Sequence, residues 1–284
     1  MTAVTRSLRH VGYVMGENPV TGAAFALFGV IVLLAIFGPL LAPYDPLATN
    51  AMNALQPPSW AHPFGTDQLG RDVLSRVIVA TRLDLGIAVS AVALSFFIGS
   101  AMGCAAGFWG GWTDRITGRI SDTIMAFPLF VLAMGVVAAL GNSVENIIYA
   151  TAVINLPFYA RVARVETAVR RNAGFVQAAR LCGNSDLRIL ATQVFPNILP
   201  PMMVQVSLNM GWAILNAAGL SFIGLGVRPP AAEWGIMVAE GATYVVSGEW
   251  WLALFPGGAL MIAVFCFNLL GDGLRDLVDP LRRT

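Results

Sequence analysis

The 284-residue chain contains no lysine, so all 17 of its basic residues are arginines. A nucleotide-binding P-loop needs a lysine that reaches the β- and γ-phosphates of ATP. The missing lysine therefore excludes a P-loop in this chain. If the protein's activity is driven by ATP, another subunit must bind and hydrolyse the nucleotide.

Cysteine and histidine are also scarce. The three cysteines, Cys104, Cys182 and Cys266, lie far apart, and His10 and His62 are isolated. This spacing fits neither a disulfide framework nor a zinc site, and no HExxH motif or nucleophile-base pair is present. We therefore expect no metal site, no cofactor bound by this chain and no catalytic residue.

Charged residues make up only 12% of the chain, whereas 57% of its residues are hydrophobic. This composition lies well outside the range of soluble domains and is typical of an integral membrane protein in contact with lipid. No basic patch interleaved with aromatic residues occurs in a polar segment, so we expect no nucleic-acid partner.

Long apolar runs can be read directly from the sequence. A helix needs about 20 apolar residues to cross a bilayer core, and the runs predict an all-α protein with six transmembrane helices. The fourth run is short unless the arginines that follow it extend to the lipid headgroups. The first is too long for a secretory signal and lacks a clear cleavage site, so we expect it to be retained. The predicted spans are 21–42, 85–112, 123–144, 146–160, 202–222 and 250–271.

The arginines are distributed unevenly between the two sides of the membrane. With a cytoplasmic N-terminus, only Arg71, Arg76, Arg82 and Arg228 fall outside. Basic residues favour the cytoplasmic side, so both termini are predicted to be cytoplasmic. The inside set is Arg6, Arg9, Arg115, Arg119, Arg161, Arg164, Arg170, Arg171, Arg180, Arg188, Arg275, Arg282 and Arg283.

The segments around the second span have their own patterns. Residues 43–65 are rich in turn formers and predict an irregular outside loop, whereas apolar residues at helical spacing over 69–78 predict an amphipathic interfacial helix. Within the span, Gly99, Gly103 and Gly107 are spaced by four. Such a row of small residues lets a second transmembrane helix approach closely.

The fifth span has one polar face. Gln205, Asn209, Trp212 and Asn216 stand at offsets of 0, 4, 7 and 11 residues. At 100° per residue these side chains lie within about 60° of one another. They could form hydrogen bonds between spans, or they could line a passage for a polar solute. The sequence leaves both interpretations open.

A polar segment between the fourth and fifth spans predicts two short helices on the cytoplasmic side. A helix over 172–181 is followed by Gly183, which can adopt a positive φ. Asn184 or Ser185 can cap a second helix, Asp186 suits its positive end, and Pro196 is predicted to close it.

This segment resembles a known signature. The residues Gln177-Ala178-Ala179, then Gly183, then Phe195-Pro196 are similar to the "EAA, three residues, Gly, then LP" pattern of binding-protein-dependent ABC importer permeases. Gln177 replaces the Glu of the pattern and Phe195 replaces its Leu. Three further blocks resemble the C-type permeases of dipeptide, oligopeptide and nickel importers, namely HPFGTDQLGRDVLSRV, GLSFIGLGVRPPAAEWG and NLLGDGLRDLVDP.

The resemblance implies a type I ABC importer transmembrane domain over about 84–272. Residues 1–83 would form the N-terminal tail, first span and periplasmic loop, and 273–284 a cytoplasmic tail. It further implies a multi-pass protein of the bacterial inner membrane, in which Gln177, Ala178, Ala179, Gly183, Asn184 and Asp186 couple to ATPase subunits.

The same resemblance implies partners and a mechanism. The partners would be a homologous second permease, two cytoplasmic ATPase subunits that bind ATP and Mg²⁺, and a periplasmic solute-binding protein. The solute would be di- or oligopeptides, or alternatively nickel chelates or glutathione-like compounds, moved by alternating access. A channel or secondary carrier and a membrane scaffold are weaker alternatives, because neither accounts for the four blocks.

Overall fold

The computed structural model describes residues 19–278. Over this range the chain is helical, and the only strand-like feature is one isolated bridge between Thr66 and Asp72. The expected all-α architecture is therefore confirmed. Residues 1–18 and 279–284 of the two predicted terminal segments, including Arg6, Arg9, Arg282 and Arg283, lie outside the described residues.

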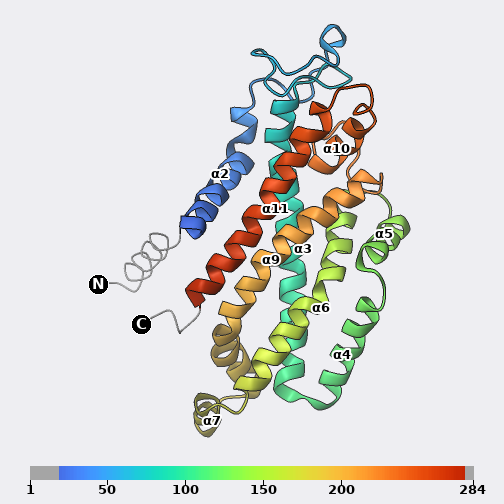
Figure 1. Cartoon of the computed structure of the whole chain (residues 1–284). Coiled ribbons are helices and arrows are strands. Elements are labelled where there is room, and N and C mark those ends of the chain that lie inside the picture. Colours follow the sequence, from blue (N-terminus) through green and yellow to red (C-terminus); the bar gives the residue numbers. More distant parts are fainter. Residues whose placement is uncertain (1–18, 279–284) are drawn as a thin grey trace.

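Long helices run side by side between a loop-rich end and the end that carries α7 (Figure 1). Four helical segments are long and apolar enough to cross a membrane, and the bent α4–α5 pair is a candidate fifth. The helices are α2 (Pro19–Leu41), α3 (Val73–Trp109), α4 (Gly111–Met125), α5 (Leu129–Leu140), α6 (Val144–Arg170), α7 (Gly174–Leu181), α8 (Asp186–Ile189), α9 (Phe195–Phe222), α10 (Trp234–Ala242) and α11 (Trp251–Val278). A short 3-10 helix covers Ala51–Asn53, and a π-helical segment, Leu190–Val194, joins α8 to α9.

The third and fourth predicted spans differ from the expected segments. Residues 123–144 do not form one straight helix, because α4 and α5 meet at an angle of 89°. Pro128 lies at the break, where its missing amide proton favours a helix start over a helix interior. The fourth span corresponds to α6, which is much longer than predicted and lies alongside α3 (Figure 1). The four candidate spans give six membrane crossings only if the α4–α5 pair crosses once and α6 crosses once.

The second and fifth spans begin earlier than predicted. The interfacial helix expected over 69–78 does not exist separately, because α3 is one 37-residue helix from Val73. Its first turns are largely buried in the protein, with Ser75 and Arg76 at most 1% exposed. The prediction that Pro196 ends a helix is also wrong. Pro196 lies inside a helical segment that continues from Asp186 to Phe222, directly after the π-helical turn Leu190–Val194.

The loop between α2 and α3 is ordered by buried charges. The Nε of Arg71 lies 2.6 Å from Asp67 Oδ2, and a second guanidinium nitrogen lies 3.6 Å from Glu240 of α10. Asp72 caps α3 by accepting from the Ser75 amide, and His62 Nδ1 lies 2.9 Å from the same carboxylate. Trp251 of α11 donates from its indole to the Thr66 carbonyl. The loop therefore forms a cap over the ends of α3, α10 and α11 (Figure 1).

Close packing of α3 on α6 forms the centre of the bundle. Gly99, Gly103 and Gly107 lie against the backbone carbonyls of Leu156, Ala160 and Arg164. The helices can approach this closely because none of the three glycines has a side chain. The row of small residues thus has the packing role that the sequence predicts.

Candidate functional site

The two short helices α7 and α8, called the helix pair below, are joined by a well-defined turn. Gly183 has φ of +78°, and its amide donates to the Arg180 carbonyl while the Asn184 amide donates to the Ala179 carbonyl. These two bonds form the Schellman pattern, in which glycine is the residue best suited to positive φ. The predicted positive φ of Gly183 is therefore confirmed.

The second helix starts as the sequence suggests. The Ser185 hydroxyl accepts from the Arg188 amide, and Asp186 lies in the first turn of α8, where its charge complements the helix dipole. Asn184 instead donates its side-chain amide to the Ala179 carbonyl. An ion pair of 3.3 Å between Arg180 and Asp186 links the two helices across the turn.

One face of the pair is anchored and the other is open. Val176 and Ile189 are fully buried, and the Arg180 guanidinium lies 5.3 Å from the centre of the Phe108 ring, near the end of α3. Leu181 and Leu187 remain 90% and 67% exposed. Exposed leucines beside charged groups are typical of a protein-binding surface. The side chains of Gln177 and Ala178 are also exposed, whereas that of Ala179 is partly buried against the core.

The four polar residues of α9 lie in different environments. Asn209 is only 3% exposed, whereas Trp212 is 61% exposed. Gln205 donates to the Asn209 side-chain oxygen, and Asn216 donates to the Trp212 carbonyl, so both bonds lie within α9. The described contacts of these side chains thus include no regular hydrogen bond to another span. Their role as a passage lining stays a prediction.

Sequence reasoning missed a buried pair of carboxyl groups. Asp84 of α3 and Glu233, the N-cap of α10, are both at most 1% exposed. Glu233 accepts from the Gly235 and Ile236 amides, and Asp84 Oδ2 accepts from the Trp234 amide. The two carboxyl groups are close enough for their negative charges to repel, and this repulsion adds to the effect of burial in favouring protonation of the pair. Only their positions in the fold reveal this pair, because they lie far apart in the sequence.

Burial raises the pKa of Glu233 above its ordinary value of 4.5, against the opposing effect of the two amide bonds. A carboxyl group with a raised pKa binds more protons in the folded state than in the unfolded state. This contribution to stability is therefore complete below about pH 4.5 and is lost as the pH rises through the folded-state pKa.

We expect Asp84→Asn to flatten this pH dependence. The asparagine amide can donate permanently to Glu233 while its oxygen still accepts from the Trp234 amide. Asp84→Leu should instead destabilise the protein by about 1–3 kcal/mol, because it leaves buried polar groups without partners. The measurement is the thermal unfolding midpoint of the purified protein across pH 4.5 to 8. Equal pH slopes for the parent and Asp84→Asn would contradict an interaction between the two carboxyl groups.

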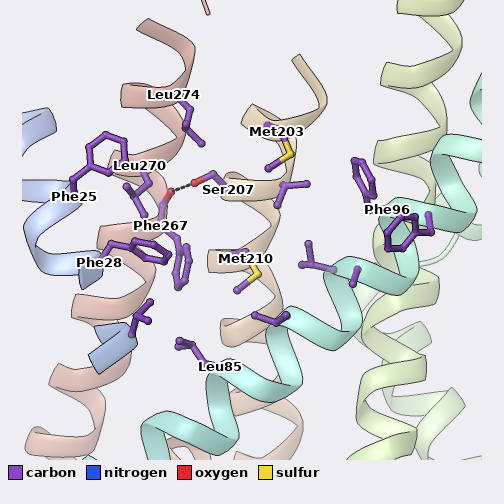
Figure 2. Close-up of a pocket in the computed structure, with 16 residues that line it drawn as sticks. Phe25, Phe28, Leu85, Phe96, Met203, Ser207, Met210, Phe267, Leu270 and Leu274 are labelled. Carbon is purple, nitrogen blue, oxygen red and sulfur yellow. Dashed lines mark hydrogen bonds between the residues drawn. The ribbon is translucent and has the colours of Figure 1, made fainter. Parts of the chain in front are cut away.

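An apolar groove of about 540 Å³ lies between α2, α3, α9 and α11. Figure 2 shows it lined by aromatic and aliphatic side chains, including Phe25, Phe28 and Met210. Its one polar side chain, Ser207, donates to the Phe267 carbonyl at 2.8 Å. The groove therefore suits hydrocarbon and offers no free polar group to a hydrophilic solute.

Within the described residues, no group of three or more His, Cys, Asp or Glu side chains is arranged to hold a metal ion. The candidate functional site thus has two parts: the exposed helix pair at one end of the molecule and the polar residues of α9 inside the bundle.

Comparison with known proteins gives the family context. Residues 96–284 match the model described as "Binding-protein-dependent transport system inner membrane component", and residues 17–58 match "N-terminal TM domain of oligopeptide transport permease C".

Among curated proteins, the chain is 44% identical over 268 residues to the "Probable D,D-dipeptide transport system permease protein DdpC" of Escherichia coli K12, covering 94% of this chain and 90% of the relative. It is 41% identical to the di/tripeptide permease DppC of Pseudomonas aeruginosa, over 88% and 84% of the two chains. Identity to the glutathione permease GsiD of Escherichia coli O1:K1 is also 41%, over 92% and 85%.

A solved structure of the MetNI methionine ABC transporter in an inward-facing conformation has the same fold. The TM-score is 0.57 at 17% identity, covering 72% of this chain and 96% of that one.

Proposed function

Because this chain belongs to the family of binding-protein-dependent transport system inner membrane components, we propose that it is a permease subunit of an ATP-driven importer of di- and oligopeptides. It would form the passage together with a homologous permease. A solute-binding protein would deliver the peptide, and two ATPase subunits with ATP and Mg²⁺ would supply the energy. The observation that carries this proposal is the exposed helix pair around Gly183, within a chain that lacks lysine and hence a P-loop.

Peptides are favoured as the solute by the names of several relatives. Glutathione, itself a peptide-like compound, is a second candidate because one relative of similar identity is a glutathione permease. Nickel chelates are the third alternative. Among the described residues, no cluster of His, Cys, Asp or Glu side chains that could bind the metal favours them.

The helix pair would couple the ATPase to the bundle. In this proposal Gln177, Ala178, Gly183 and Asp186 contact a groove on an ATPase subunit. Arg180 would then transmit its movement to α3 through Phe108, which lies 5.3 Å away. Ala179 and Asn184 would hold the turn through their hydrogen bond, so that the pair moves as one body.

Movement of the pair would switch the passage between inward and outward access. Gln205, Asn209, Trp212 and Asn216 are proposed to line that passage, in a domain over about 84–272. Both termini would lie in the cytoplasm. By reciprocity, a loaded binding protein outside should alter the nucleotide affinity of the ATPase subunits inside.

The test is gentle purification of the tagged chain from its native membrane, followed by mass spectrometry and reconstitution. Recovery of a second permease and P-loop ATPases, with ATP-dependent uptake of a radiolabelled dipeptide, is the expected result. Recovery of the chain alone with uptake that needs no ATP would replace the proposal with a secondary carrier.

A further inference from the structure

Four of the buried polar groups that lack a hydrogen-bond partner among the described residues lie on α6 and α9. They are the Thr151 hydroxyl, the Asn155 amide nitrogen and the Tyr159 hydroxyl of α6, with the Asn209 amide nitrogen of α9. Each side chain is at most 3% exposed. Such groups are costly at membrane depth unless they meet a partner or water, so their grouping calls for a physical reason.

The groups of α6 form one column. Thr151, Asn155 and Tyr159 are spaced by four residues, which keeps their side chains within about 80° around the helix. The Tyr159 hydroxyl faces the Asn209 side chain, although the geometry falls short of a regular hydrogen bond. The Asn209 oxygen already accepts from Gln205, so its free group is the amide nitrogen. The column therefore adjoins the polar face of α9.

The backbone of α6 is weakened at this column. Pro157 lies inside the helix, between the turn that carries Asn155 and the turn that carries Tyr159. Proline removes one backbone hydrogen bond and is a common cause of helix bending. The neighbouring α9 also contains two internal prolines, Pro200 and Pro201. Both sides of the α6–α9 seam can thus bend more easily than an unbroken helix.

All four unpartnered groups can donate a hydrogen bond: two are amide nitrogens and two are hydroxyls. A solute that fits these groups must supply hydrogen-bond acceptors, and it does not have to carry a positive charge. Peptide backbone carbonyls and a terminal carboxylate have this chemistry.

We propose that the α6–α9 seam opens during the transport cycle and that Thr151, Asn155, Tyr159 and Asn209 then form a donor-rich subsite for the carbonyl or carboxylate oxygens of a peptide. This inference rests on the proposed importer function. It extends that function to α6, where the subsite would provide hydrogen bonds to a peptide moving past it.

Thiol labelling tests the opening in the full complex. The three native cysteines are replaced, as Cys104→Ala, Cys182→Ser and Cys266→Ala, and Thr151→Cys is introduced. Ala150→Cys is the matched control, because Ala150 is the adjacent residue at the same depth and is fully buried in an apolar cluster. The complex is reconstituted with its ATPases and binding protein. A small, charged, membrane-impermeant methanethiosulfonate is then applied without nucleotide and after vanadate trapping with a dipeptide.

We expect Thr151→Cys to react at least about tenfold faster than Ala150→Cys in one of the two states, because reaction requires an accessible, ionised thiol. Asn155→Cys on the same background should behave alike, and it replaces Thr151→Cys if that variant does not assemble. If the column cysteine and the control cysteine react equally slowly in both states, while the complex still imports dipeptide with ATP, the subsite alone is overturned. Absence of ATP-driven dipeptide uptake by the assembled parent complex would overturn the importer function and the subsite with it.

Discussion

Gly183→Val is expected to remove most of the ATP-driven uptake while the chain still inserts into the membrane. The φ of +78° at Gly183 is unfavourable for a β-branched residue, and holding it there costs about 1–3 kcal/mol. A Cβ at this position would meet no atom within 4 Å, so the penalty comes from the backbone and not from a clash. Loss of the Schellman bonds would change the angle between α7 and α8.

The expected loss of coupling is between about fivefold and a hundredfold, since 1.4 kcal/mol corresponds to a factor of ten. The measurements are co-purification of the ATPase subunits and peptide-stimulated ATP hydrolysis. Gly183→Asn should retain more activity than Gly183→Val, because asparagine tolerates positive φ. Gly174→Ala is a second control, since Gly174 also has open space but does not have a positive φ. Normal assembly and stimulation in Gly183→Val would refute the coupling role of this turn.

Gly103→Leu is expected to prevent stable folding of the bundle. A Cβ at Gly103 would lie 2.2 Å from the Ala160 carbonyl oxygen and 2.8 Å from the Ala163 Cβ. These neighbours are backbone and a short side chain, so only separation of α3 from α6 can relieve the overlap. Overpacking of a core typically costs about 1–3 kcal/mol, and a clash with backbone should reach or exceed the upper end.

The matched control for Gly103→Leu is Gly86→Leu on the same helix, where a Cβ would meet nothing within 4 Å. Membrane abundance and the unfolding midpoint in detergent should fall sharply for Gly103→Leu and change little for Gly86→Leu. Similar losses for both variants would contradict the close-packing role of this row, since leucine is a better helix former than glycine and should not by itself destabilise α3.

The elements that were predicted well depend on local chemistry. A run of apolar residues is sufficient to indicate a span, and the Gly183–Asp186 stretch is sufficient to indicate a turn followed by a capped helix. The glycines of α3 likewise indicated a close helix contact, although the sequence did not identify α6 as the partner. The bend at Pro128 and the early start of α3 were missed, because hydrophobicity averages over a segment and does not locate its breaks.

The polar residues show where local reasoning fails. The face of α9 was found from its periodicity, but Asn209 proved to be buried beside Tyr159 and Trp212 largely exposed. On α6, the sequence does not distinguish Thr151, Asn155 and Tyr159, since single polar residues in a short span have no local signature.

The sequence by itself determined that this protein is a membrane-embedded helical bundle without a P-loop, with a polar helix pair between two spans. Composition, span length and turn chemistry are local properties, which each segment carries independently of its neighbours. Only the tertiary structure placed Asp84 against Glu233 and the α6 column beside Asn209. These juxtapositions depend on how closely and at what rotation the helices pack, and that is decided by contacts between residues far apart in the chain.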